Sequence, residues 1–340
     1  MHQKDPWAAL APLGWDDRRS AELAEIENEP TPARVARVDR GGALALSADG
    51  PVRVVGGDLA AGDWIAVAGE RVAAVLERRS AIVRRAAGRA DARQVIAANV
   101  DVVVAAQAAD RPLRVRRLHR ALALAWEGGA VPVVALTKAD LGFAPETEAA
   151  VWSLGVDVVE VSALTGGGVG RIAELARPAR TIVLIGESGA GKSSLANSLL
   201  GRQELATGAV RDGDAKGRHT TTARHLLPLP SGGALIDTPG VRELGLWSDE
   251  GAGVAIAFGD IDDLASGCRF GDCRHDGEPG CAVIAAVRSG ELAADRLESY
   301  RGLSREVAAM ERRADERARR AHGRAGARMA REANRWKGRR

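Results

Sequence analysis

The chain has 340 residues, of which 46% are hydrophobic and 27% are charged, and its formal net charge is +3. This length allows one to three domains with a sizeable core, and three cysteines are too few for a secreted disulfide framework. The chain contains no run of about 18 apolar residues and no apolar signal-peptide segment near Met1. We therefore expect a cytoplasmic protein without membrane spans.

Residues 1–32 are polar and acidic and are predicted to form a loose or weakly helical extension. Residues 33–86 contain five short runs of β-forming residues separated by glycines, which favours a small β-barrel such as an OB-fold. A three-stranded sheet is the alternative. OB-folds often bind single-stranded nucleic acid on aromatic side chains, but Trp64 is the only aromatic residue of this segment, so support for such binding is weak. The five runs are Ala33–Val38, Ala43–Ser47, Pro51–Val55, Asp63–Ala68 and Arg71–Leu76.

After a basic linker at Arg84–Arg89, residues 95–247 alternate between strand and helix patterns. The apolar run Val100–Ala106 suits a buried parallel strand. This alternation predicts a doubly wound α/β domain. The other expected strands are Val131–Leu136, Val156–Val161, Thr181–Ile185 and Ala234–Ile236, and the expected helices are Val115–Ala125, Glu146–Leu154, Gly170–Ala176 and Lys192–Leu200.

The first motif of this domain is Thr137-Lys138-Ala139-Asp140, which follows a predicted strand and is similar to the guanine-reading sequence N-K-x-D. The Asp140 carboxylate can accept hydrogen bonds from guanine N1 and N2, a donor pair that adenine lacks. Lys138 can lay its alkyl stem along the base, whereas Thr137 has a shorter reach than asparagine. At the end of the next strand, the backbone of Ser162 and Ala163 is predicted to support the guanine.

The second motif, Gly186–Ser193, has the form G-x-x-x-x-G-K-[ST] between a predicted strand and a predicted helix. Its backbone N–H groups and the helix N-terminus favour phosphate, with a chance glycine-rich turn as the alternative. Lys192 is expected to bridge the β- and γ-phosphates, and Ser193 to bind Mg²⁺. The expected phosphate-binding residues are Gly186, Glu187, Ser188, Gly189, Ala190, Gly191, Lys192, Ser193 and Ser194.

The third motif is Asp237–Gly240, at the end of a predicted strand. Asp237 can hold Mg²⁺, and Gly240 can donate its N–H to the γ-phosphate. The polar segment Gly217–Thr222 lies where a Mg²⁺-sensing loop is expected, with Thr222 as the first candidate ligand and Thr221 as the second. A polar surface loop is the alternative.

Many GTPases carry a glutamine directly after this third motif, where it orients the attacking water. Here the position is Val241, which cannot orient water. We therefore expect slow intrinsic hydrolysis that a partner accelerates. His219 is a candidate replacement, because an imidazole can position or deprotonate water; a solvent-facing loop histidine is the alternative.

The base-reading motif precedes the phosphate-binding motif, the reverse of the order in most small GTPases. A packed α/β domain tolerates such a circular permutation if its strands keep their neighbours. The phosphate-sensing motif then ends the domain, so whatever follows is tied to the loop that senses the γ-phosphate.

Residues 248–340 show helical patterns over Ser248–Leu264 and Ala282–Gly302, then over residues 303–335. Four ligand-type residues in this region suit a closed, tetrahedral, structural Zn²⁺ site. A disulfide would leave an odd thiol, and a catalytic zinc ion needs an open coordination position. The expected ligands are Cys268, Cys273, His275 and Cys281.

From Arg301 to Arg340 the chain holds 14 lysines and arginines against 5 acidic residues. This excess indicates an anionic partner, nucleic acid first, with a solvated arginine-rich helix as the alternative.

Together the T-K-x-D, S-A-L, G-E-S-G-A-G-K-S-S, G-R-H-T-T-T and D-T-P-G-V-R motifs, followed by C-x₄-C-x-H-x₅-C, resemble the circularly permuted, small-ribosomal-subunit-dependent GTPase A family of bacteria. The resemblance spans roughly residues 33–310. It implies an N-terminal OB-fold, a permuted GTPase core and a C-terminal α-helical zinc domain. It also implies binding to the 30S subunit and its 16S rRNA late in maturation, with GTP hydrolysis stimulated by that subunit; we expect a monomer. The alternatives are a P-loop small-molecule kinase and an RNA-binding module with a vestigial nucleotide site.

Overall fold

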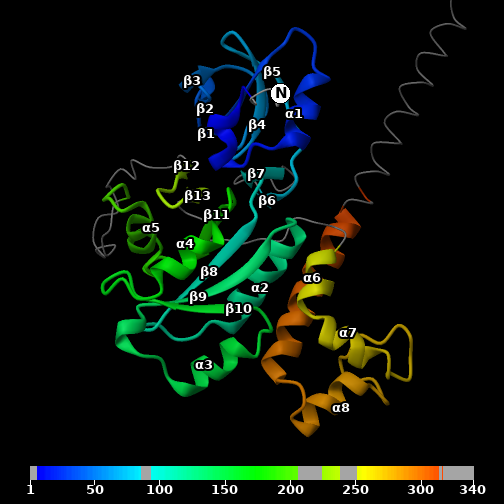
Figure 1. Cartoon of the computed structure of the whole chain (residues 1–340). Helices are drawn as coiled ribbons and strands as arrows, with labels where there is room; N and C mark the ends of the chain where they lie inside the picture. The colour runs from blue at the N-terminus through cyan, green and yellow to red at the C-terminus, as the bar shows by residue number, and fades with distance from the viewer. Residues whose placement is uncertain (1–5, 86–92, 206–223, 238–250, 314–315, 317–340) are drawn as a thin grey trace, which may run out of the picture. The chain divides into compact units, whose positions relative to one another are not determined.

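The computed structural model describes residues 6–85, 93–205, 224–237, 251–313 and 316. The chain divides into two compact units, Met1–Gly245 and Leu246–Arg340 (Figure 1). None of the helices among the described residues is long and apolar enough to cross a membrane.

The N-terminal segment is folded onto the strands that follow it, where the sequence predicted a loose or weakly helical extension. It forms a 3-10 helix, η1 (Ala8–Leu13), and helix α1 (Asp17–Ala24), whose N-cap residue Asp16 accepts the Arg19 backbone N–H at 3.1 Å. The segment is ordered because its large apolar side chains pack into one buried cluster. That cluster contains Leu10, Leu13, Trp15, Leu23, Trp64, Ala66 and Leu76.

The next five strands form the predicted OB-type barrel. β1 pairs antiparallel with β2 and β4, β2 with β3, and β4 with β5. A bridge between Val55 and Arg71 joins the end of β3 to the start of β5 and closes the ring. All five predicted runs form strands, and small and β-branched side chains fill the interior. The strands are β1 (Thr31–Asp39), β2 (Gly42–Ser47), β3 (Gly50–Val54), β4 (Trp64–Ala68) and β5 (Arg71–Val75).

Trp64, the one aromatic residue of the barrel segment, belongs to the core. Its side chain is 1% exposed, and its ring centroid lies 5.1 Å from that of Trp15. A base cannot stack on a buried ring, so Trp64 offers no platform for nucleic acid.

A buried arginine ties the barrel to its surroundings within the first unit. Arg34 donates hydrogen bonds to the carbonyl oxygens of Leu13, Gly62 and Asn99 and to the Thr181 hydroxyl, the last at 2.7 Å. Burial lowers the pKa of Arg34 to about 9, so the guanidinium is still charged at neutral pH. Because Thr181 begins the strand that leads into the phosphate-binding motif, one side chain connects the N-terminal segment, the barrel and that strand.

The prediction of a basic linker over Arg84–Arg89 is wrong for its first two residues, Arg84 and Arg85, which belong to a strand. β6 (Ala81–Arg85) pairs antiparallel with β7 (Arg93–Ala98) in a separate two-stranded sheet. The pair forms because Ile82 and Ile96 are buried in the core of the α/β domain, so basic residues at the strand end did not prevent pairing. The rest of the linker lies outside the described residues.

The α/β domain has the predicted parallel sheet, with the strand order β10-β9-β8-β11-β13. An unpredicted strand, β12, pairs antiparallel with β13 and continues the sheet to β1 of the barrel. The strands are β8 (Val102–Ala108), β9 (Val131–Thr137), β10 (Asp157–Val161), β11 (Thr181–Gly186), β12 (His225–Pro228) and β13 (Ala234–Asp237).

Helices cover both faces of this sheet, which confirms the doubly wound prediction (Figure 1). One face buries Leu118, Leu122 and Val151, and the other buries Ile172 and Leu195. The helices are α2 (Val115–Glu127), α3 (Pro145–Trp152), α4 (Val169–Leu175) and α5 (Lys192–Leu200), with a 3-10 turn η2 (Ala139–Leu141) after β9.

The described part of the second unit is helical, with α6 (Ala252–Ala257), α7 (Gly259–Ala265) and α8 (Ala282–Ser289) followed by helical residues 294–313. The predicted helix Ala282–Gly302 is broken where Gly290 takes the left-handed conformation, with φ of 82°, and ends α8. Of the predicted helix 303–335, residues 303–313 and 316 are helical, and the remainder lies outside the described residues.

Candidate nucleotide and metal sites

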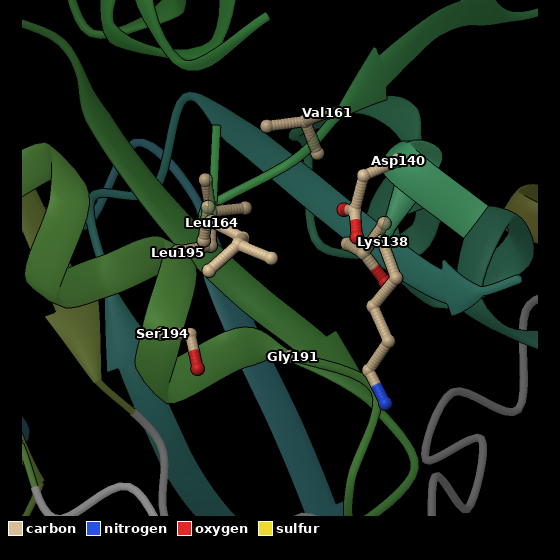
Figure 2. Close-up of a pocket in the computed structure, with 9 residues that line it drawn as sticks. Lys138, Asp140, Val161, Leu164, Gly191, Ser194 and Leu195 are labelled. Atoms are coloured by element: carbon tan, nitrogen blue, oxygen red, sulfur yellow. The ribbon is translucent and has the colours of Figure 1, made fainter. Parts of the chain in front are cut away.

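The base-reading and phosphate-binding motifs, far apart in the sequence, line one cavity of about 240 Å³ at the carboxyl ends of the parallel strands (Figure 2). This edge is where doubly wound folds bind ligands. Three of the lining residues, Val161, Leu164 and Leu195, are apolar and were not predicted as site residues. The lining consists of Thr137, Lys138, Asp140, Val161, Ala163, Leu164, Gly191, Ser194 and Leu195.

The carboxylate that is expected to read guanine is held by a neighbouring hydroxyl. Ser162, which is 3% exposed, donates a hydrogen bond to Asp140 Oδ1. This contact orients the carboxylate at the cavity wall. Ser162 was expected to contribute only its backbone, so its side-chain role was missed.

Thr137 joins the two halves of the site. Its hydroxyl donates to the carbonyl oxygen of Ala190 in the phosphate-binding motif at 2.8 Å and lies 3.3 Å from the Gln107 carbonyl oxygen. Its side chain is buried at 3% exposure. The hydroxyl is therefore engaged with the backbone of two neighbouring segments.

Lys138 reaches toward the end of β8. Its Nζ lies 2.5 Å from Asp110 Oδ2, and this hydrogen bond lowers the pKa of Asp110. Asp110 was missed because nothing in its local sequence marks it. The strand order would have identified Asp110 as a site residue. Because β8 lies between β9 and β11, the carboxyl end of β8 must adjoin both motifs.

The phosphate-binding motif wraps from β11 into α5, as predicted. Gly186 has φ of +147°, and a Cβ there would lie 2.6 Å from the Ala106 carbonyl oxygen, so only glycine fits beside β8. Lys192 donates to the carbonyl oxygens of Gly186 at 2.9 Å and Glu187 at 2.5 Å. Burial lowers the pKa of Lys192, while the carboxylates of Asp237 and Glu187 act in the opposite direction.

The candidate Mg²⁺ ligands lie on adjacent elements. Ser193 is in the first turn of α5, and Asp237 ends β13, which pairs parallel with β11. The other expected residues of this region, Gly240, Val241, His219, Thr221 and Thr222, lie outside the described residues.

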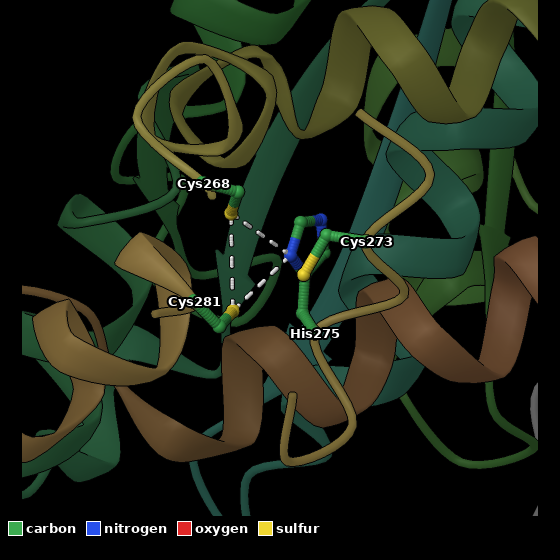
Figure 3. Close-up of side chains that lie close together, drawn as sticks. All are labelled: Cys268, Cys273, His275 and Cys281. Atoms are coloured by element: carbon green, nitrogen blue, oxygen red, sulfur yellow. Dashed lines mark hydrogen bonds between the residues drawn. The ribbon is translucent and has the colours of Figure 1, made fainter. Parts of the chain in front are cut away.

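The second site is the predicted cysteine–histidine cluster. Cys268 and Cys273 follow α7, His275 lies in the next turn, and Cys281 caps the N-terminus of α8. The four side chains converge, and their ligand atoms all lie within 4.8 Å of one another (Figure 3). Burial lowers the pKa of His275, which favours the neutral imidazole that a metal ligand requires.

The spacing of these atoms fits a tetrahedral ion. His275 Nδ1 lies 3.6 Å from Cys268 Sγ and 3.4 Å from Cys281 Sγ, and the two sulfurs are 3.9 Å apart. Zinc bond lengths at tetrahedral angles give edges of about 3.6 Å for S···N and about 3.8 Å for S···S. These three atoms are therefore spaced as ligands of one ion, and with Cys273 Sγ all four ligand atoms lie within 4.8 Å of one another, so the cluster can hold a metal ion.

Comparisons with known proteins agree with this geometry. A model of the RsgA GTPase family matches residues 75–247. A Streptomyces coelicolor protein named small ribosomal subunit biogenesis GTPase RsgA is 46% identical over 336 residues, covering 92% of this chain and 90% of its own. A protein of the same name from Opitutus terrae is 43% identical, and the match covers 90% of this chain and 92% of the Opitutus protein.

Two solved structures share the fold. YjeQ from Thermotoga maritima matches with a TM-score of 0.60 at 24% identity, covering 82% of this chain and 98% of its own. YloQ, described as a circularly permuted GTPase, matches with a TM-score of 0.59 at 23% identity. This match covers 84% of the present chain and 96% of the YloQ chain. The permuted order of motifs and the family match lead to the same conclusion. The chain belongs to the RsgA GTPase family.

Proposed function

We propose that this GTP hydrolase is an assembly factor that binds the 30S ribosomal subunit and its 16S rRNA late in maturation, and that the subunit stimulates its hydrolysis of GTP. The observation that carries the proposal is the joining of a base-reading motif to a phosphate-binding motif through Thr137 and Ala190. The names of relatives more than 40% identical over most of the chain supply the ribosomal setting. In this proposal the protein works as a cytoplasmic monomer.

The nucleotide site divides into two ends. Asp140 selects guanine, while Lys138, Ala139, Ser162 and Ala163 surround the base. The phosphate end uses the backbone of Gly186–Gly191 and the α5 N-terminus, with Lys192 at the β- and γ-phosphates. Mg²⁺ accompanies GTP and is held by Ser193 and Asp237, with Thr222 as a further candidate ligand and Gly240 at the γ-phosphate.

The cysteine–histidine cluster holds Zn²⁺ in a structural role. Three thiolates and one imidazole are a ligand set that zinc prefers, and four protein ligands leave no open position for chemistry. We assign residues 33–86 to the OB-fold, 95–247 to the GTPase domain and 248–340 to the zinc-binding and basic helical domain, with 1–32 as the N-terminal segment.

Turnover measured with and without purified 30S subunits tests the proposal. We expect slow hydrolysis by the protein alone, because Val241 stands where other GTPases orient water with glutamine, and a marked acceleration by the subunit. Lys192→Ala serves as the inactive control. His219→Ala should lower the stimulated rate by about 100-fold if its imidazole positions the water, while leaving GDP affinity unchanged. Equal turnover with and without 30S subunits would refute the ribosomal role.

A further inference from the structure

The loop after β8 follows the strand that lies between the two motifs of the candidate nucleotide site, although none of its residues belongs to a recognised motif. β8 lies between β9, which leads into the base-reading motif, and β11, which leads into the phosphate-binding motif. Ala108, the last residue of β8, is in register with Thr137, the last residue of β9. The residues that follow Ala108 therefore stand between the base end and the phosphate end.

This loop is held by its own hydrogen bonds. The Arg111 N–H lies 3.3 Å from the Ala108 carbonyl oxygen, and the Ala109 N–H donates to the Thr137 carbonyl at 3.0 Å. The buried Gln107 amide lies 3.1 Å from the Ala108 carbonyl oxygen and 3.4 Å from that of Arg111. These contacts fix the position from which the Arg111 side chain extends.

The Arg111 side chain rests on the phosphate-binding loop at Gly189. A Cβ at Gly189 would lie 2.4 Å from Arg111 Nη2 and 3.1 Å from its Cζ, and Gly189 has φ of +79°. A side chain at position 189 would displace the guanidinium from this place. The cation thus lies against the middle of the loop, three residues before Lys192.

Three other cationic side chains near the phosphate-binding loop have a carboxylate or carbonyl partner, and Arg111 differs from them in its ion pairing. Lys138 pairs with Asp110, Arg117 pairs with Glu187, and Lys192 donates to loop carbonyls. No carboxylate of the described residues forms an ion pair with the Arg111 guanidinium, whose residue is exposed. A guanidinium has a planar set of N–H donors that matches phosphate oxygens, which suits Arg111 to an anionic ligand.

We propose that Arg111 is a further nucleotide-binding residue that donates to the phosphates common to GDP and GTP. This inference rests on the proposed nucleotide site. Lys192 is at the β- and γ-phosphate end, and Arg111 reaches the loop from the side of β9 and the base-reading motif. The contact therefore falls on the part of the triphosphate nearer the base, which hydrolysis leaves in place, and Arg111 acts in binding rather than in the chemical step.

Equilibrium binding of GDP, GTP and guanosine to Arg111→Ala tests this role. We expect about tenfold weaker binding of GDP and of GTP, the effect of losing a charged hydrogen bond. Guanosine, which has no phosphate, should bind as it does to the wild type. Arg111→Lys, which keeps the charge but not the fork, should be intermediate. Arg114→Ala removes an exposed arginine of the same loop that makes no side-chain capping bond and serves as the matched control.

Two results would overturn the assignment: GDP and GTP affinities within twofold of wild type, or an equal loss for guanosine, which would indicate a distorted base site. Wild-type protein in the same assay separates this inference from the proposed function. If ATP displaces GDP from the wild type as well as GTP does, the guanine site itself is wrong. If GTP alone displaces GDP and Arg111→Ala behaves as wild type, only the role of Arg111 fails.

Discussion

The nucleotide site and the cysteine–histidine cluster differ in how much of the chain each one needs. The cluster draws its four ligands from Cys268–Cys281, a stretch held between two short helices. The cavity of the candidate nucleotide site is lined by residues from Thr137–Asp140, Val161–Leu164 and Gly191–Leu195, which meet only because the strands that lead into them lie in one sheet. The cysteine–histidine cluster is formed within one short stretch of chain, whereas the nucleotide site depends on the packing of a whole domain.

This difference explains why the nucleotide site tolerates a permuted order. Its residues are placed by strand neighbours and not by chain connectivity, so β9 and β10 can precede β11 without changing which side chains meet. A cluster of closely spaced ligands has no such freedom, because its geometry is a property of the loop itself.

Removal of the metal should give the largest effect and should separate the two regions. Structural zinc contributes on the order of 10 kcal/mol to small domains, so Cys281→Ser or strong chelation is expected to unfold the second unit. Metal analysis and circular dichroism would record the lost ion and the lost helix. GTP affinity of the first unit should stay within about twofold, and re-addition of Zn²⁺ to the chelated wild type provides the control. A parallel loss of GTP binding at the same chelator concentration would show that the two regions are not independent.

Asp140→Asn should give the next largest effect, confined to the nucleotide site. Loss of a carboxylate that accepts two guanine hydrogen bonds should weaken GTP binding by about 100-fold and remove the preference over ATP. XTP carries an oxygen where guanine has its 2-amino group, so the amide of the variant should bind XTP better than the wild type does. Competition against labelled GDP measures all three. An unchanged preference for GTP over ATP would mean that another group reads the base.

Thr137→Val should give a smaller effect that tests the link between distant segments. Valine keeps the shape of threonine but leaves the Ala190 carbonyl without its hydroxyl donor, a loss worth about 1–2 kcal/mol. We expect GDP and GTP to bind about tenfold more weakly, with metal content unchanged. Thr137→Ser keeps a hydroxyl and should stay within about threefold. If Thr137→Val binds GDP as tightly as Thr137→Ser does, this hydrogen bond does not hold the two halves together.

Much of the molecule could be predicted from the sequence because its signals are local. The barrel strands, the alternation of the α/β domain, the phosphate-binding loop and the cysteine–histidine cluster each lie in one continuous stretch with a recognisable period or spacing. The motif order alone indicated the circular permutation.

Contacts between distant segments were decided by the tertiary structure. The N-terminal segment, predicted to be loose, is packed because Trp15 and its apolar neighbours are buried together. Part of the predicted basic linker forms a strand pair because Ile82 and Ile96 are buried in the core. In both segments the free energy gained by burying apolar side chains outweighs the local polarity of the sequence. Asp110 and Arg111 belong to no sequence motif. They lie near the base-reading and phosphate-binding motifs only because β8 lies between β9 and β11. A sequence specifies what each segment can form, whereas the order of strands in the sheet specifies which side chains share a site.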